Sequence, residues 1–219
     1  MIENLYPTPI YYEIVKNVNP IQEEIKSCIK DIKFFQKKTW DPSLLLSNEL
    51  DKNILQTHKL RLTEKEIFSH VKKYMAALSP QALYLFHHSF KNNTTRIQSW
   101  FTLSKKGTVG HIHNHGYVDI SGVYYYQTNE KDGNIFFECP NKLLEASQCY
   151  YHNSSERWEH RPMVGKLLLF PGWLNHGVHV NRTNNNRISL SFNTFSVDTL
   201  GSKENLTHLD LRKMINEHN

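Results

Sequence analysis

The sequence predicts a mainly β protein, a sandwich or barrel, in which helices come first and strands follow. After Pro80 the chain breaks into short runs rich in β-branched and aromatic residues, and turn residues separate these runs at regular intervals. Aromatic residues make up 12% of the chain, which also favours β structure. Because the 219 residues show neither an internal repeat nor a linker, we expect a single domain, with a helical segment at 1–80, a β core at 81–197 and a tail at 198–219.

Two amphipathic helices are predicted in the N-terminal segment. The first spans residues 20–37, where apolar residues recur at spacings of three and four and Pro20 suits the first helical turn. The second begins at Thr63, which forms a capping box with Glu66. The segment 39–53 between them is predicted to be a loop.

Nine strand-like runs follow, separated by turn signals such as Lys131-Asp132-Gly133. The tail is predicted to form a short helix from Thr207 onward. The predicted strands are Leu83–Phe90, Thr95–Leu103, Gly110–His115, Ser121–Gln127, Gly133–Glu138, Gln148–His152, Met163–Phe170, His176–Val180 and Arg187–Thr194.

Composition and charge limit the class of protein. The chain is 39% hydrophobic and 21% charged, as in ordinary globular proteins, and its net charge of +5 comes without a patch that interleaves arginine with aromatic residues. Its three widely spaced cysteines, Cys28, Cys139 and Cys149, form neither a disulfide framework nor a zinc ribbon. No signal peptide or membrane-spanning run is visible, so we expect a cytoplasmic protein without a membrane partner.

The densest chemical signal is a group of histidines. His113 and His115 are two residues apart, so on a strand both imidazoles point to the same side. Such a pair binds a borderline metal ion, such as Fe(II), Zn(II) or Mn(II), once a third ligand joins it. His176, which follows a strand and the tight turn Pro171-Gly172, is the predicted third ligand. His111 lies on the same face by alternation and is assigned to the rim.

A second cluster lies on the last predicted strand, where apolar and polar residues alternate. Arg187, Ser189, Ser191 and Asn193 share one face, which points either to solvent or into a site. Arg187 follows His176 by eleven residues, with a hairpin-like loop between, which predicts that the two lie on neighbouring antiparallel strands. A guanidinium beside a metal ion, with a serine hydroxyl two residues on, is suited to bind a carboxylate.

Five motifs in the β core carry a family resemblance. They are His113-x-His115, Ser121-Gly-Val-Tyr-Tyr, Gly133-Asn-Ile-Phe-Phe-Glu-Cys-Pro140, Pro162-x-x-Gly165-Lys-Leu-Leu-Leu-Phe-Pro171 with His176, and Arg187-Ile-Ser-Leu-Ser-Phe-Asn193. Together they resemble the 2-oxoglutarate/Fe(II)-dependent oxygenases, whose wider relatives are the prolyl hydroxylases. The resemblance is specific over about residues 100–193 and weaker before them.

This resemblance implies a jelly roll (a double-stranded β-helix) for the core and a dioxygenase activity, with Fe(II) and 2-oxoglutarate as cofactor and cosubstrate. Such an enzyme would hydroxylate a substrate and release succinate and CO₂. The implied metal ligands are His113, His115 and His176. The residues implied to bind the far carboxylate of 2-oxoglutarate are Arg187, Ser189 and Tyr125.

The metal triad departs from the family's usual pattern. That pattern is two histidines and one carboxylate, whereas position 115 holds a histidine. Three interpretations stay open: the iron accepts three neutral imidazoles, Asp119 supplies the carboxylate, or the site binds metal without turnover.

Two rival functions also stay open. A cupin-type metalloprotein would use Asp119 as a fourth ligand and would not need Arg187 to face the metal. A non-catalytic ligand-binding jelly roll would hold no stoichiometric iron. The sequence does not identify the substrate, which can be a protein, a small molecule or a nucleic acid, and it leaves a homo-oligomer open.

Overall fold

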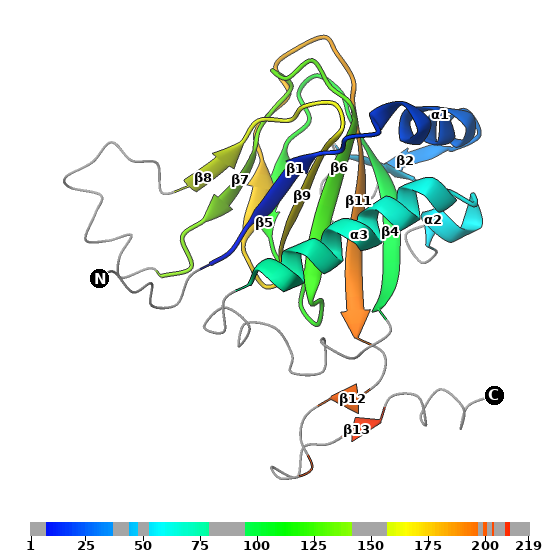
Figure 1. Cartoon of the computed structure of the whole chain (residues 1–219). Helices are drawn as coiled ribbons and strands as arrows, with labels where there is room; N and C mark the ends of the chain where they lie inside the picture. The colour runs from blue at the N-terminus through cyan, green and yellow to red at the C-terminus, as the bar shows by residue number, and fades with distance from the viewer. Residues whose placement is uncertain are drawn as a thin grey trace.

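Two antiparallel sheets face each other in the computed structural model (Figure 1), which describes residues 8–36, 44–47, 53–78, 95–141, 157–196, 199–200, 203 and 209–210. The helices are α1 (Val18–Ile29), α2 (Ile54–Thr57) and α3 (Arg61–Ala77). The strands are β1 (Tyr11–Ile14), β2 (Phe34–Gln36), β3 (Leu45–Ser47), β4 (Thr95–Ser104), β5 (Gly110–His113), β6 (Ile120–Gln127), β7 (Ile135–Glu138), β8 (Arg157–His160), β9 (Lys166–Pro171), β10 (His176–Val178), β11 (Arg187–Ser196), β12 (Thr199–Leu200) and β13 (Leu209–Asp210).

The two sheets differ in size. The larger has the strand order β1-β9-β6-β11-β4-β3-β2 and the smaller β5-β10-β7-β8. All of their pairings are antiparallel, and β12 and β13 form a separate pair that lies away from both sheets (Figure 1). The mainly β jelly-roll class predicted from the sequence is confirmed.

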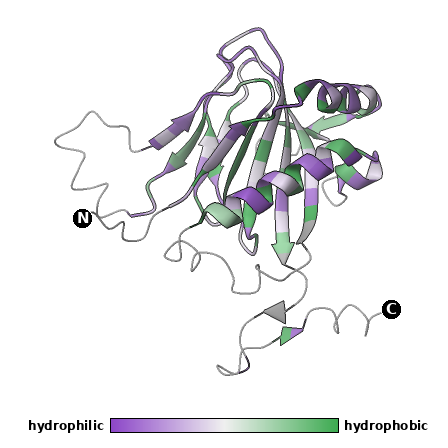
Figure 2. Cartoon of the chain, in the orientation of Figure 1, coloured by the Kyte–Doolittle hydropathy of each residue, from purple (hydrophilic) through white to green (hydrophobic). Residues whose placement is uncertain are grey.

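The helices cover the outer face of the larger sheet (Figure 1). Their apolar residues, among them Ile25 and Ile67, form one hydrophobic core with Phe101, Leu190 and Phe192 of the sheet. Charged and polar residues occupy the solvent side of α1 and α3, as the alternating colours of the helices in Figure 2 show. This core therefore fixes the outer face of β4, β6 and β11 and leaves their other face for the space between the sheets.

A second core lies between the two sheets. It contains Val123 and Tyr125 of β6, Ile135 and Phe137 of β7, and Phe170 of β9. The rings of Phe137 and Phe170 meet edge to face at 4.9 Å between centroids. This contact joins the smaller sheet to the larger one, and the site described below begins beside it, because the ring of Phe170 lies 4.6 Å from that of His176 between centroids.

The first helix is shorter than the sequence predicts. α1 ends at Ile29, and the end of the predicted helix forms strand β2 instead, which pairs with β3. Strand pairing satisfies the backbone hydrogen-bonding groups of this segment, and Phe34 packs against the core from β2. The helical spacing of apolar residues continues through this segment, although the segment is a strand. Asn17 occupies the N-cap position, so Pro20 sits in the first turn, where its missing N–H costs no helical hydrogen bond.

The second helix begins differently from the prediction. α3 starts at Arg61, and the expected capping box of Thr63 and Glu66 is wrong. The carboxylate of Glu24, from α1, instead accepts the backbone N–H groups of Leu62 and Thr63 at 2.9 and 2.8 Å. The Thr63 hydroxyl donates to the same carboxylate at 2.7 Å. An acidic side chain from a neighbouring helix thus caps α3.

Seven of the nine predicted strands are confirmed with shifted ends: they correspond to β4, β5, β6, β7, β9, β10 and β11. The predicted strands Leu83–Phe90 and Gln148–His152 lie outside the described residues. β1, β3, β8 and α2 were not predicted, and β3 falls in the expected loop. The predicted C-terminal helix is wrong at Leu209–Asp210, which pair as β13 with β12, and residues 211–219 lie outside the described ranges.

We expect Glu24→Ala to lower the free energy of unfolding by about 1–2 kcal/mol, because it removes the cap of α3 and a tie between two helices. Urea denaturation measures this change. Glu23→Ala is the matched control: its exposed ion pair with Lys26 should contribute less than about 0.5 kcal/mol. Equal effects of the two substitutions would contradict the capping role.

Candidate metal centre

Strand pairing brings two of the three predicted ligands together. β10 pairs with β5, and His176 lies directly opposite His113 in this register. Because paired residues on neighbouring strands point to the same face, the two imidazoles meet, with 4.4 Å between ring centroids.

His115 joins them from just beyond the end of β5. Its backbone N–H donates to the carbonyl of Gly172 at 2.8 Å, which ties this segment to the turn before His176. Its ring centroid lies 5.0 Å from that of His113 and 5.2 Å from that of His176. Each of the three residues offers a ring nitrogen, and these nitrogens lie within 4.8 Å of one another. The sequence-predicted triad is therefore assembled in the fold.

Backbone carbonyls orient two of the rings. The Nδ1 of His113 lies 2.8 Å from the carbonyl oxygen of His111, and the Nδ1 of His176 lies 2.9 Å from that of Leu174. A carbonyl oxygen only accepts, so each Nδ1 carries the proton and donates it. This tautomer leaves Nε2 of both rings with a lone pair, which is the form that binds metal ions.

Burial keeps two of the three imidazoles, those of His115 and His176, uncharged. Burial lowers the pKa of His176 to about 3, and the neighbouring His113 lowers it further, while the hydrogen bond to Leu174 opposes the shift. Burial lowers the pKa of His115 to about 4, again with a contribution from His113. Both imidazoles therefore stay neutral at neutral pH and need to lose no proton before they bind a metal ion.

The donor set fits a borderline divalent metal ion such as Fe(II). Three imidazole nitrogens on one side leave the opposite side open, as in facial-triad iron sites, but here without the usual carboxylate. Within the described ranges no carboxylate belongs to this group of metal-binding residues, and Asp119 is not part of it. His111 is exposed and also lies outside the group, as predicted.

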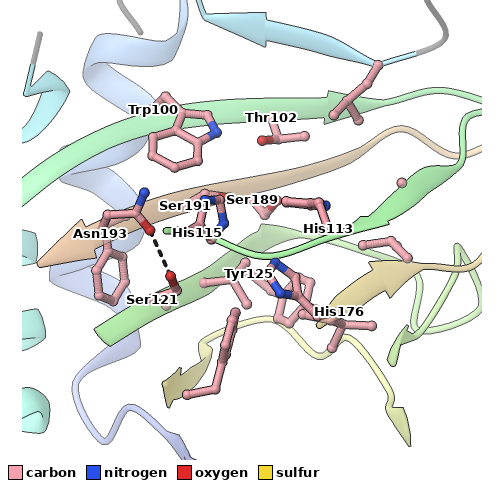
Figure 3. Close-up of a pocket in the computed structure, with 18 of the residues that line it drawn as sticks. Trp100, Thr102, His113, His115, Ser121, Tyr125, His176, Ser189, Ser191 and Asn193 are labelled. Carbon is pink, nitrogen blue, oxygen red and sulfur yellow. Dashed lines mark hydrogen bonds between the residues drawn. The ribbon is translucent and has the colours of Figure 1, made fainter. Parts of the chain in front are cut away.

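A cavity of about 120 Å³ extends from the histidines between the two sheets (Figure 3). Its polar lining comes mainly from the larger sheet: the inward residues of β4, β6 and β11 point into it. The side chains from these three strands that line it with a polar atom are Trp100, Thr102, Ser121, Tyr125, Arg187, Ser189, Ser191 and Asn193. The polar face of β11 therefore faces a site and not the solvent.

Arg187 stands at the start of β11, and its side chain is 4% exposed. The prediction that Arg187 and His176 lie on neighbouring paired strands is wrong: β11 pairs with β4 and β6, whereas β10 pairs with β5 and β7. The two residues instead line the same cavity from opposite sheets, because the connecting loop crosses from one sheet to the other. Arg187 and His176 thus face a common cavity, as predicted, but from opposite sheets and not from neighbouring strands.

Two backbone carbonyls hold the guanidinium. Its Nη1 donates to the carbonyl oxygens of Asp132 and Gly133 at 2.9 and 2.6 Å. Gly133 has φ +101°, and a Cβ there would lie 2.2 Å from the carbonyl oxygen of His179, so only glycine allows this approach. The buried carboxylate of Asp132 shapes the turn by accepting hydrogen bonds from Thr128 and from the backbone of Asn129.

Tyr125 and Ser189 lie beside this guanidinium. They are paired across β6 and β11 and both line the cavity. Burial raises the pKa of Tyr125 to about 12, Arg187 opposes the shift and Asp132 adds to it. The phenol therefore keeps its proton and is available as a donor. Tyr124 points to the opposite face, where its hydroxyl accepts a hydrogen bond from Gln22.

Residues 98–193 match the protein family described as "Putative 2OG-Fe(II) oxygenase", where 2OG stands for 2-oxoglutarate. This segment is therefore similar to that family. The match spans β4 to β11 and so contains the three histidines and Arg187. The resemblance drawn from the sequence motifs is confirmed, and no curated protein matches the chain.

Several solved structures share the fold of this chain. HygX from Streptomyces hygroscopicus, with nickel and 2-oxoglutarate bound, has a TM-score of 0.59 at 12% identity and covers 86% of this chain and 83% of its own. A prolyl-4-hydroxylase from Pseudomonas putida has a TM-score of 0.56 at 12% identity, covering 86% and 93%. SnoN, an α-ketoglutarate-dependent epimerase from nogalamycin biosynthesis, has a TM-score of 0.57 at 11% identity, covering 88% and 80%.

Sequence reasoning overlooked several residues of the site. Trp100 lines the cavity, and its ring lies 6.3 Å from that of His115, but a tryptophan on a strand carries no signal by itself. Asp132 and Gly133 were recognised only as a turn, because their contact with Arg187 joins distant segments of the chain.

We expect His113→Ala, His115→Ala and His176→Ala each to weaken Co(II) or Fe(II) binding at least tenfold, since even the loss of a group that only orients a ligand has effects of this size. Calorimetric titration of the metal-free protein measures the affinity. His111→Ala is the matched control and should bind as the wild type does, because its exposed side chain lies outside the group of metal-binding residues and the backbone carbonyl that orients His113 is kept. Unchanged affinity in His115→Ala would remove His115 from the ligand set.

The pH dependence of stability should report the buried imidazoles. Because the pKa of His176 is lower in the folded protein than the ordinary value of 6.5, the unfolded chain binds the proton first as the pH falls. The stability of the metal-free protein should thus decrease below pH 6.5, by about 1–2 kcal/mol for this group at pH 5. His176→Asn should reduce the decrease between pH 7.5 and 5, measured by urea unfolding; an unchanged decrease would contradict the burial effect.

Proposed function

We propose that this oxygenase is an Fe(II)- and 2-oxoglutarate-dependent dioxygenase that hydroxylates its substrate. In the proposal His113, His115 and His176 hold Fe(II). Arg187, Ser189 and Tyr125 bind the far carboxylate of 2-oxoglutarate. One observation carries the proposal: a single cavity runs from the three histidines to a buried arginine. A dicarboxylate with a keto group at one end needs a metal ion there and a cation at the other.

The residues around Arg187 suit a carboxylate. The guanidinium is buried, so a carboxylate there meets little competition from water, and a charge-assisted hydrogen bond is strong in such a place. Nη1 is engaged by two carbonyls, which fixes the plane of the group. Ser189 and the protonated Tyr125 offer two hydroxyl donors from the neighbouring strands. The three groups would bind the carboxylate from three directions.

When bound, Fe(II) supplies the oxygen activation by which 2-oxoglutarate and O₂ become succinate and CO₂ while a substrate C–H becomes C–OH. The chain's own residues prepare the place for it. The three histidines keep one side of the metal position open, and Val178, Ile135 and Phe170 give the cavity apolar walls that exclude bulk water. The HygX structure, solved with nickel and 2-oxoglutarate, supports this use of the fold.

The cupin interpretation lacks its distinguishing features. It needs Asp119 beside the metal, but the backbone of Asp119 is engaged with Thr194 and Gly172, and its side chain is outside the group of metal-binding residues. It also needs no arginine in the cavity, whereas Arg187 lines it. We therefore favour three neutral imidazoles as the ligand set over a ligand role for Asp119.

We further propose a cytoplasmic enzyme with one domain, in which residues 1–80 support the core 81–197 and the tail 198–219 follows. The packing of α1, α2 and α3 on the larger sheet supports a common core for the first two segments. No helix among the described residues is long and apolar enough to cross a membrane.

The test is an anaerobic titration of the Fe(II)-loaded protein with 2-oxoglutarate. Chelation of the keto acid should produce a visible metal-to-ligand charge-transfer band. Arg187→Met should raise the dissociation constant of 2-oxoglutarate at least tenfold, since it removes a charge-assisted hydrogen bond.

Arg157→Met is the matched control, because Arg157 lies 4.3 Å over the ring of Phe136 and does not line the cavity. It should leave the titration unchanged. No band in the iron-loaded wild type would disprove the oxygenase function, and an equal effect of the two substitutions would disprove the role of Arg187.

A further inference from the structure

One polar group in the cavity belongs neither to the three histidines nor to the residues around Arg187. Asn193, on β11, is 5% exposed and lines the cavity. Its Oδ1 accepts a hydrogen bond from the hydroxyl of Ser121 at 2.8 Å. This bond fixes the orientation of the amide, and Figure 3 shows Nδ2 turned away from Ser121, toward the side on which Trp100 lies. Among the described residues no acceptor pairs with Nδ2, and the atom is not fully buried, so this donor is open to the cavity.

The position of Asn193 along β11 separates it from the cosubstrate. A strand rises about 3.3 Å per residue, so Asn193 lies roughly 20 Å from Arg187 along the strand. Ser191 pairs with Trp100, whose ring approaches His115, so this stretch of β11 lies at the histidine end of the cavity. A five-carbon diacid anchored at Arg187 reaches the metal before it reaches Asn193. The amide therefore faces the space that a substrate would occupy.

The charges around this space favour an anion. Among the described residues that line the cavity there is no aspartate and no glutamate. The three imidazoles bring no negative charge to the metal, unlike a triad with a carboxylate. Arg187 is the one side chain with a permanent charge among the described residues that line the cavity, and the carboxylate of Asp132 acts on it from outside the cavity. A substrate amine would find no carboxylate among the described residues that line this space, whereas a substrate carboxylate would gain a hydrogen-bond donor and the attraction of the nearby positive charge.

We propose that Asn193 is a substrate-binding residue that donates from Nδ2 to a carboxylate of the substrate, which makes anionic molecules the substrate class of this enzyme. The inference rests on the proposed function, since it assigns the substrate side of the same cavity. Ser121 is the positioning residue that orients the amide, and the indole of Trp100 forms a flat wall for the apolar portion of the substrate.

Three probes of similar shape and different charge test the proposal: phenylacetate, phenylacetamide and phenethylamine. Calorimetry measures their binding to the Zn(II)-loaded protein saturated with 2-oxoglutarate, which cannot turn over. In the wild type phenylacetate should bind at least tenfold more tightly than phenethylamine. No detectable binding of phenylacetate at about 10 mM, or tighter binding of the amine, would overturn the assignment.

Variants of Asn193 locate the effect. Asn193→Leu should weaken phenylacetate binding about tenfold and leave the dissociation constant of 2-oxoglutarate unchanged. Asn193→Asp keeps the acceptor for Ser121 but replaces the donor with a carboxylate, so the preference should reverse in favour of phenethylamine. Asn184→Leu and Asn184→Asp, at an exposed asparagine bonded to Lys106, are the matched controls and should change nothing.

The failures are distinguishable. If the iron-loaded wild type shows no charge-transfer band with 2-oxoglutarate, the proposed function itself fails. If the band forms in every variant but Asn193→Leu binds phenylacetate as the wild type does, only the role of Asn193 fails. If Asn193→Leu weakens 2-oxoglutarate instead of phenylacetate, the amide serves the cosubstrate and the proposal is likewise overturned. Zinc content measured for each variant excludes loss of the metal as the cause.

Discussion

The alternation of side chains along β11 is the constraint on which the rest of the structure depends. Leu190 and Phe192 are fully buried against the helices, while Arg187, Ser189 and Asn193 point to the other face. Because the period of a strand is two, a shift of one residue would bury the arginine under the helices and turn the phenylalanine into the cavity. Pairing with β4 and β6 along nearly the whole strand prevents such a shift. The hydrophobic core thereby sets the chemistry of the cavity.

The second determinant is electrostatic. His115 and His176 are neutral because burial disfavours their charged forms, and no carboxylate joins them in the described group of metal-binding residues. Relative to a triad with a carboxylate, the site gains one unit of positive charge, which weakens its hold on a divalent ion and strengthens its attraction for anions. The histidine at position 115, which replaces the usual carboxylate, thus affects both the affinity for the metal ion and the charge of the substrate that the site favours. Arg187 adds to this field from the far end of the cavity.

Local patterns in the sequence predicted the features of this site that depend on one strand at a time. The spacing of His113 and His115 and the alternation from Arg187 to Asn193 are such patterns. Contacts between distant segments could not be predicted: the pairing of β10 with β5 rather than with β11, and the carbonyls of Asp132 and Gly133 that hold Arg187. For the same reason the cap of α3 was assigned to its own residues, although a carboxylate from α1 supplies it. Periodicity determines which face a residue occupies, but not which segment it meets.

The two ends of the cavity are held by different kinds of contact, and this difference suits their tasks. At the Arg187 end a glycine at φ +101° and a buried aspartate shape a turn whose carbonyls bind the guanidinium, so this end is rigid before any ligand arrives. At the histidine end the backbone of His115 and the Ser121–Asn193 pair orient groups whose other side faces the cavity. In the proposed function the fixed end would bind the cosubstrate, which is the same in every turnover, whereas donors directed at open space would discriminate among substrates. The proposed specificity therefore depends on the few positions of β4, β6 and β11 nearest the histidines, among them the amide of Asn193.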